Sequence, residues 1–447
     1  MSMLYIYHSK HQNTKSRLLR IQIPIKIYEK IKNSFVSIKI NNAEFFYKIS
    51  NERRFVVPKE LKGKINFQKE NQITIEKLKF IKRTGKNIVI KKEKLDLLSF
   101  IPDKLRSGTK INLLLWKNSL ICFYKSPKGT LRKIEIRKEV PLEFCRLLGY
   151  YQAEGGKEKK IKKSGRQVVF TNTHINLISD FIILSKNLFK TNLWNAEIRI
   201  KKANKMKEAL IQNMLKKLGI NKKNIKIRIG DNLKDFSIRL YICSTILSDI
   251  IIRIMENIKN YLITENILNK KNNLKMYISF MQGLFAGDGN YNTYKNKKGG
   301  VHHRLIFYEE DYNYALQYKK LLKKIGMESK IIKIKDKNLF IIRATLNWDF
   351  LLLIKELGLF DCHIHHKTSL IESIKRHKSY RSHKYLISMP NKIDIKKVQK
   401  VIKKEKVICY NWLKKMVERG VIIKRDANRW ELSEKGKRIK RILKEIS

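Results

Sequence analysis

Alternating hydrophobic and polar residues mark the first third of the chain. Residues 20–26 (Arg-Ile-Gln-Ile-Pro-Ile-Lys) and 37–40 (Ser-Ile-Lys-Ile) alternate with a period of two, which is typical of half-exposed strands. We therefore predict a β-rich domain over residues 1–140, a small barrel or sandwich. No motif in this segment carries recognisable chemistry, so its role stays open.

From residue 141 onward, helix-like and strand-like patterns recur in the same order in two halves, 141–275 and 276–376. In the second half we predict strands at 301–308, 329–335 and 338–344 and helices at 309–325 and 348–357. In the first half we predict strands at 167–171, 196–201 and 236–242 and a helix at 176–189. An extra basic segment, about 203–232, is interpreted as an insertion. With the β-rich segment before them, the two halves predict an α+β fold.

The last segment, residues 390–447, changes character. Its pattern predicts helices at 393–404 and 407–419, two short strands at 421–425 and 429–432, and a final helix opening at 433–438. This order resembles a winged helix-turn-helix domain, a DNA-binding fold. The resemblance implies that Lys414 and Lys415 lie near the recognition helix and Arg429 on the wing. A basic helical tail with a hairpin is the alternative.

Charge narrows the class of partner. The chain of 447 residues has 99 Lys and Arg against 39 Asp and Glu, a net charge of +60. This bias favours nucleic acid over an anionic membrane or an acidic protein. No apolar run approaches the roughly 18 residues of a membrane helix, and the N-terminus lacks the apolar core of a signal peptide. The five cysteines include no Cys-x-x-Cys pair, which favours reduced thiols in a reducing compartment. We therefore expect a cytoplasmic location, intracellular and associated with the nucleoid.

Two short stretches are nearly the same: residues 147–155 (Leu-Leu-Gly-Tyr-Tyr-Gln-Ala-Glu-Gly) and 281–289 (Met-Gln-Gly-Leu-Phe-Ala-Gly-Asp-Gly). Each predicts an apolar helix with small residues four apart, on one face. Two such faces allow close helix packing, which would bring Glu154 and Asp288 side by side. Acids in a last helical turn oppose the helix dipole and repel each other, whereas divalent cations favour them. An ordinary buried helix with a glycine cap is the alternative for either stretch taken alone.

These two stretches resemble the motifs of a single-chain, two-repeat LAGLIDADG homing endonuclease. The first departs from the usual letters at Gln152 and has glutamate at Glu154, where aspartate is commoner. The resemblance implies two pseudo-symmetric α-β-β-α-β-β-α halves with the motif helices at their interface.

The resemblance also implies a reaction and a cofactor. Mg²⁺ or Mn²⁺ would be held by Glu154 and Asp288, with Gly155 and Gly289 beside them, and would support phosphodiester hydrolysis. One acid from each half implies cleavage of both strands of double-stranded DNA by a monomer, across the minor groove, leaving short 3′ overhangs over a long recognition site.

Further site residues are implied by position only. The family places a basic residue near each centre, for which Lys367 and Lys271 are the best matches. Asn172 and Glu309 fall where relatives often hold the water shell of the metal.

Several predicted strands share a basic face, and such a curved surface can read the major groove. A solvated outer face is the alternative. The residues predicted to contact DNA from the strands are Arg199, Lys201, Lys226, Arg228, Arg239, Arg304, Lys333 and Lys335.

Two other functions remain open on sequence alone. A non-cleaving DNA-binding regulator of the same fold is one, and an RNA intron maturase, with intron RNA as partner, is the other. The histidine-rich run at residues 362–366 is interpreted as DNA-facing or structural because no second pair stands at the spacing of a zinc finger.

Overall fold

The computed structural model describes residues 4–9, 20–41, 43–58, 71–78, 88–105, 108–116, 118–125, 131–155, 167–189, 193–204, 207–231, 236–295, 301–334 and 337–447. The chain divides into two compact units: residues 1–84 with 109–135, and residues 85–108 with 136–447. Residues 85–108 thus interrupt the predicted N-terminal domain, 1–140, and group with the second unit.

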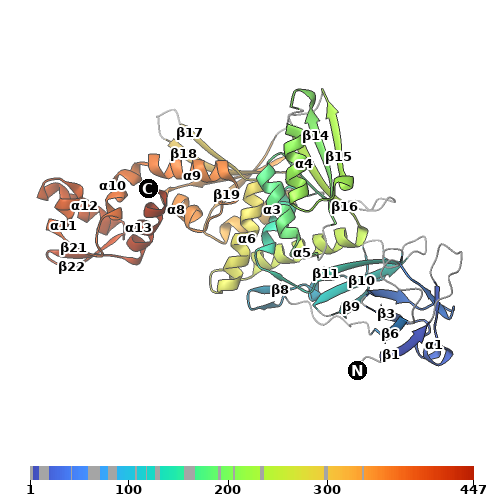
Figure 1. Ribbon diagram of the computed structural model, residues 1–447. Helices are drawn as coiled ribbons and strands as arrows, with labels where there is room; N and C mark the ends of the chain where they lie inside the picture. The colour runs from blue at the N-terminus through green and yellow to red at the C-terminus, as the bar shows by residue number, and fades with distance from the viewer. Residues whose placement is uncertain are drawn as a thin grey trace. The chain divides into compact units, whose positions relative to one another are not determined.

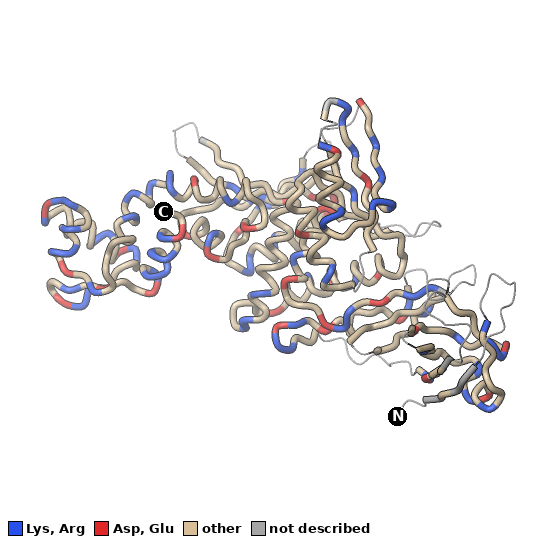
Figure 2. The backbone as a smooth tube through the Cα atoms, in the orientation of Figure 1, with Lys and Arg blue, Asp and Glu red and all other residues tan. Residues whose placement is uncertain are grey.

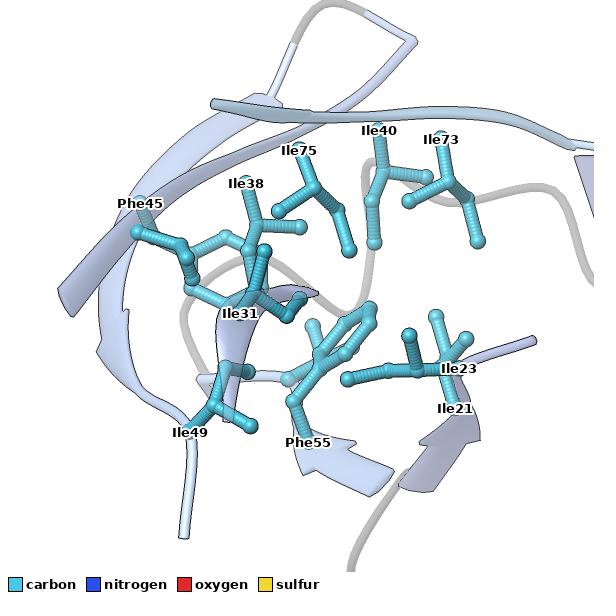
Figure 3. Close-up of a cluster of buried hydrophobic side chains, with 12 residues drawn as sticks. Ile21, Ile23, Ile31, Ile38, Ile40, Phe45, Ile49, Phe55, Ile73 and Ile75 are labelled. Atoms are coloured by element: carbon cyan, nitrogen blue, oxygen red, sulfur yellow. The ribbon is translucent and has the colours of Figure 1, made fainter. Parts of the chain in front are cut away.

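The first unit is rich in strands (Figure 1). Its elements are β1 (Leu4–Ser9), β2 (Arg20–Gln22), α1 (Ile25–Ile31), β3 (Phe35–Ile40), β4 (Ala43–Lys48), β5 (Arg54–Val56), β6 (Asn71–Lys77), β9 (Asn112–Trp116), β10 (Ser119–Lys125) and β11 (Leu131–Arg137). They form sheets of order β1-β6-β3-β4, β11-β10-β9 and β2-β5. The core enclosed by the sheet β1-β6-β3-β4, the pair β2-β5 and α1 is mostly isoleucine, with Phe45 and Phe55 inserted among the side chains (Figure 3).

One predicted strand of this unit is wrong in its second half. Residues 20–22 form β2, but the chain turns at Pro24 and residues 25–31 form α1. The fixed φ of proline suits the start of a helix, and Ile31 of α1 is buried in the core. Alternation across Pro24 therefore did not mark one continuous strand.

The second unit contains two similar runs of helices and strands. Three short strands precede the first run: β7 (Ile90–Lys91), β8 (Lys94–Asp96) and β12 (Glu139–Pro141), in a sheet of order β12-β8-β7. A short 3₁₀ helix, η2 (Leu98–Phe100), follows β8. The first run comprises α2 (Phe144–Glu154), β13 (Gln167–Asn172), α3 (Ile175–Ser185), β14 (Asn195–Lys201), η3 (Lys202–Asn204), α4 (Lys207–Lys217), η4 (Lys222–Asn224), β15 (Ile225–Gly230), β16 (Phe236–Cys243) and α5 (Thr245–Thr264). The second comprises α6 (Lys271–Gly287), β17 (Asn290–Lys295), β18 (Val301–Glu309), α7 (Tyr312–Lys323), β19 (Ser329–Lys333), β20 (Phe340–Leu346) and α8 (Trp348–Glu356).

Each run contributes a four-stranded sheet, of order β13-β16-β14-β15 and β17-β18-β20-β19. The second sheet is antiparallel throughout, whereas β15 lies parallel to β14 at the edge of the first. The segment 203–232, interpreted as an insertion, contains α4 and β15, and nothing comparable joins β19 to β20. The insertion therefore adds a strand to the first sheet.

Both sheets bury one face. In β14, Ala196, Ile198 and Ile200 are buried, and Ile238 and Leu240 of β16 lie on the same side. The alternate residues of these strands are mostly polar, as the period of two requires. The prediction of a mixed α+β fold is confirmed.

The end of the chain begins with α9 (Ile364–Arg376), α10 (Lys378–His383) and η5 (Lys384–Ile387). It continues with β21 (Lys392–Asp394), α11 (Ile395–Ile402), α12 (Lys406–Glu418), β22 (Ile422–Asp426), β23 (Arg429–Leu432) and α13 (Glu434–Ile446). The helix predicted from residue 393 begins at 395, because Asp394 caps it and Ile393 pairs with Trp430 as part of β21.

Among the helices that the structure describes, none combines the length and the apolar character needed to cross a bilayer.

Candidate active site

The two motif helices, α2 and α6, are in direct backbone contact. A Cβ added to Gly149 would lie 2.1 Å from the carbonyl oxygen of Phe280, and one added to Gly283 would lie 2.1 Å from that of Arg146. Both distances are far inside van der Waals contact, so only glycine fits at either position. The close packing predicted from the small residues is therefore present.

The same packing continues to the acid-bearing ends of the helices. A Cβ added to Gly287 would lie 2.4 Å from Cβ of Ala153 and 3.3 Å from Cγ of Glu154. Glu154 and Asp288 line one pocket of about 640 Å³. Its other lining residues are Thr171, Asn172, Thr173, His174, Ser237, Ala286, Gly287, Gly289, Asn290, Tyr308, His363 and His366.

Glu154 is held from the first sheet. Asn172, the last residue of β13, donates from Nδ2 to Oε1 of Glu154 at 3.4 Å, while its own Oδ1 accepts from the backbone N–H of His174 at 2.7 Å. Asn172 is buried because it lies on the apolar face of β13, after Val168 and Phe170. Its amide is thus fixed at both ends.

Asp288 is held from α7 through a buried chain of hydrogen bonds. The hydroxyl of Tyr318 donates to Oδ2 of Asp288 at 3.3 Å and accepts from Nε2 of Gln152 at 3.3 Å. Oε1 of Gln152 in turn accepts from Nζ of Lys259 at 3.0 Å, and Lys259 also pairs with Glu256 at 2.9 Å. Burial, and then the charge of Asp288, raise the pKa of Tyr318 well above its usual value, so the phenol remains a donor.

Lys259 on α5 is an ammonium with no exposed side-chain surface. Burying a charge without partners is costly, and Gln152, Glu256 and the ring of Tyr314 at 4.3 Å surround this one. Gln152, which departs from the usual motif letters, is the residue that links this cation to Tyr318. The sequence identified Gln152 only as a departure and missed Lys259 and Tyr318.

Lys271 does not lie near the carboxylates, contrary to its predicted role. It is the first residue of α6, and at about 1.5 Å per residue it is roughly 25 Å along the axis from Asp288. Its side chain is 89% exposed and lies 3.9 Å from Glu93. The prediction placed the start of the motif helix after residue 275, whereas α6 begins at 271.

Lys367 lies in the first turn of α9 and pairs with Asp361 at 3.1 Å. It is not among the described residues that line the pocket, where His363 and His366 lie instead. Glu309 is likewise absent from that lining. Its Oε1 accepts backbone N–H bonds from Glu310 and Asp311 ahead of α7.

Histidines that the sequence did not assign to the site form part of its wall. His363 and His366 stack with ring centroids 3.9 Å apart, and His174 from the other half lies 5.0 Å from His363. Burial, followed by the charges of the neighbouring histidines, lowers the pKa of His363 to about 4. Burial also lowers the pKa of His366. These rings are therefore neutral near pH 7.

The donor set suits a hard divalent cation. Within the described residues no group of three or more His, Cys, Asp and Glu side chains could hold a metal ion. Mg²⁺ commonly uses one or two carboxylates and takes its other ligands from water and substrate phosphates. The two carboxylates of Glu154 and Asp288 in one pocket fit that requirement. Each is followed directly in the chain by a glycine, Gly155 or Gly289.

The first sheet presents five of the predicted DNA-contacting residues on its polar face. Cross-strand pairs join Arg199 to Arg228 and Lys226 to Glu197, and Arg239 is the partner of Glu197 on the other side. Lys201 follows on the same face of β14. Figure 2 shows repeated Lys and Arg along β14 and β15.

The second sheet agrees less well with the prediction. Arg304 lies on its polar face, with its guanidinium 3.4 Å from the centroid of Tyr294. Lys333 is paired with Phe340 and so lies on the opposite face, with Ile331 and Ile342. Arg343 and Lys330, which the prediction omitted, are the basic residues aligned with Arg304. Lys335 lies outside the described residues.

The basic residues predicted near the C-terminus are exposed. Lys414 and Lys415 lie on α12 and Arg429 on β23. The hydroxyl of Tyr410 on α12 donates to Asn428 at 2.9 Å, which ties this helix to the turn between β22 and β23.

A family model described as a LAGLIDADG-like domain matches residues 275–355, so the prediction of such a domain is confirmed for this part of the chain. No curated protein sequence matches the chain.

Several solved structures are similar to parts of it. One is I-DmoI in complex with DNA and Mn, at 19% identity and a TM-score of 0.26, over 45% of this chain and 89% of that one. Another is full-length DUF199/WhiA from Thermatoga maritima, at 14% identity and a TM-score of 0.27, over 62% of this chain and 90% of that one.

Proposed function

We propose that the protein is a site-specific, metal-dependent endonuclease of the LAGLIDADG type that cleaves both strands of duplex DNA. The observation that carries the proposal is the packing of α2 against α6, which places Glu154 and Asp288 in one pocket. The match of residues 275–355 to the LAGLIDADG-like domain model supports it for the second half. The pair of similar runs, each starting with a motif helix, supports an equivalent role for the first.

In this proposal each carboxylate supports cleavage of one strand of the DNA duplex. A divalent cation bound there would neutralise charge on the scissile phosphate and activate a water. Asn172 orients Glu154, and Tyr318 orients Asp288. Neutral His363 and His366 close one side of the pocket without adding charge that would repel a metal.

The basic faces of the two sheets would lie along the DNA, with exposed Lys414, Lys415 and Arg429 adding contacts as a winged helix does. A net charge of +60 supports a long polyanionic partner.

A selection tests the proposal. The full chain is incubated with a randomised duplex library in Mg²⁺ and, separately, in Ca²⁺, and both the cut ends and the bound pool are sequenced. We expect cut ends with short 3′ overhangs on one long motif in Mg²⁺.

A bound motif without cut ends would instead support a DNA-binding regulator. Preferential binding of structured RNA without duplex binding would support a maturase. Either result would overturn the endonuclease proposal.

A further inference from the structure

A single acidic side chain lies among the arginines on the polar face of the first sheet. Glu197 of β14 is only 5% exposed, yet it is on the face that is otherwise basic. Its Oε1 accepts from Nε of Arg199 at 2.8 Å and pairs with Nε of Arg228 at 3.1 Å, while Oε2 pairs with Arg239 at 3.7 Å. Three arginines from three strands therefore converge on one carboxylate.

The strand register explains the convergence. Arg199 is two residues after Glu197 on the same strand and so on the same face. Arg239 of β16 is its direct cross-strand partner, and Arg228 of β15 is diagonal to it. Diagonal neighbours on one face are within reach of long side chains. Glu197 is thus placed so that one carboxylate reaches all three guanidinium groups.

The carboxylate is ionised in this setting. Burial raises its pKa, but the hydrogen bond from Arg199 and the charges of Arg199, Arg228 and Arg239 together bring the pKa below the usual glutamate value. Glu197 is therefore negatively charged in the folded protein near neutral pH, and both of its carboxylate oxygens are paired with arginines.

Charge neutralisation alone does not account for the cluster. One carboxylate facing three guanidinium groups leaves the cluster positive, and Lys201 and Lys226 add to it on the same face. The arginines also stay accessible, with Arg228 69% exposed. Because Arg199 and Arg228 use Nε toward Glu197, their four terminal N–H donors each remain available for another acceptor.

Arg239 is fixed by more than the carboxylate. A terminal nitrogen donates to Oε1 of Gln167 at 3.0 Å, and the guanidinium lies 5.5 Å from the ring of Tyr241. In the second sheet, Arg304 is held differently, against the ring of Tyr294. Among the described residues of the two sheets, arginines gathered around one carboxylate are found in the first sheet.

We propose that Glu197 is a specificity-determining residue that holds the guanidinium forks of Arg199 and Arg228 in fixed directions to read guanines in one half of the DNA site. Arginine donates two hydrogen bonds to O6 and N7 of guanine in the major groove, and this is the commonest specific contact. A pre-oriented fork loses less freedom on binding than a mobile one. This inference rests on the proposed binding of duplex DNA but not on cleavage.

The test compares the full chain with Glu197→Gln in a bound-pool selection on a randomised duplex library in Ca²⁺. The wild-type consensus should contain guanines at two or more positions in one half. In the variant, guanine preference at those positions should fall by about tenfold, the discrimination of one good bidentate contact. The other half of the consensus should not change.

The affinity of Glu197→Gln for non-specific duplex DNA should change in the opposite direction to its guanine preference. Removal of a negative charge from a basic face should raise that affinity slightly, whereas a variant that merely misfolds would lose it. Glu372→Gln on α9, which also removes a carboxylate paired with an arginine, is the matched control and should leave the consensus unchanged.

Arg199→Lys and Arg228→Lys complete the test because each keeps the charge and loses the fork. Each should lose guanine preference at a single position. The proposal is overturned if the consensus of Glu197→Gln equals that of the wild type, or if neither half contains guanines that depend on these arginines. Binding without any sequence preference by the wild type would overturn the proposed function as well.

Discussion

At the scale of single residues, the two acids differ in how they are supported. Glu154 is held by the amide of Asn172, at the edge of the pocket. Asp288 is held by the phenol of Tyr318, which belongs to a buried chain ending at the ammonium of Lys259. The motif letters alone identify the acids. Asn172 was singled out by its position in the resemblance, whereas Tyr318 and Lys259, which come from elements distant in sequence from Asp288, were missed.

Removal of the Tyr318 hydroxyl should weaken the function of Asp288 without unfolding the protein. In Tyr318→Phe the ring still fills its buried site, and Asp288 loses one donor. A hydrogen bond to a charged group of this kind supports a fall of about tenfold to a hundredfold in the rate of cleavage at limiting Mg²⁺. The measurement is the rate as a function of Mg²⁺ concentration, with binding in Ca²⁺ as control. Unchanged rates at every Mg²⁺ concentration would show that the phenol does not orient Asp288.

His363 should make stability depend on pH. Its folded pKa of about 4 lies below the value of about 6.5 for an unfolded histidine. As the pH falls from 6.5 toward 4, the unfolded chain binds a proton that the folded chain does not, so stability is lost through this window. The melting temperature should therefore be lower at pH 5 than at pH 7.5.

His363→Asn is the matched variant because Nδ1 of His363 accepts from the N–H of His366 at the start of α9, and asparagine can replace that cap. The variant should show a smaller fall between pH 7.5 and pH 5. The other buried histidines would maintain part of the slope. A slope equal to that of the wild type would exclude His363 as a contributor.

At the scale of elements, the interface between α2 and α6 is the least tolerant part of the site. In Gly149→Ala the new methyl would meet the backbone of Phe280 and Leu284, which cannot move aside as a side chain can. We expect a loss of at least about 3 kcal/mol in the free energy of unfolding, at the upper end for overpacking. Chemical denaturation measures it.

Lys271→Ala is the control on the same pair of helices. The side chain is 89% exposed, so its removal should change neither stability nor cleavage by more than a small amount. A large loss of cleavage in this variant would restore the catalytic role that its position in α6 excludes.

Element positions were predictable where a local signal exists. The strand 301–308 and the helix from 348 agree with β18 and α8, since alternation and the Asn347 cap are local features. Lys333 was assigned to the wrong face because its face depends on pairing with Phe340, which the strand alone does not contain. The strand β21 was missed for the same reason: three residues pair with β23 far along the chain.

At the scale of the whole molecule, the net charge indicates a polyanionic partner. With a net charge of +60, each phosphate contact would release a counterion from DNA. We expect the logarithm of the affinity for duplex DNA to fall linearly with the logarithm of the salt concentration, by about a thousandfold or more between 50 and 200 mM salt. Titrations at four salt concentrations measure the slope. An affinity that does not change with salt concentration would contradict binding that is mainly electrostatic.

The composition predicted such a partner, and the repeated motif predicted where two acids meet. Neither could show the insertion of β15 as an edge strand or the grouping of residues 85–108 with the second unit, because both depend on contacts between distant segments.

The central claim is that Glu154 and Asp288 act together in one pocket on the two strands of DNA. The most direct measurement uses the duplex obtained by selection, cleaved in Mg²⁺ by the wild type, Glu154→Gln and Asp288→Asn, with binding measured in Ca²⁺. Each variant should lose double-strand cleavage while its affinity stays within a few-fold of the wild type, because the amides preserve shape and remove charge. Double-strand cleavage at the wild-type rate by either variant would contradict the claim.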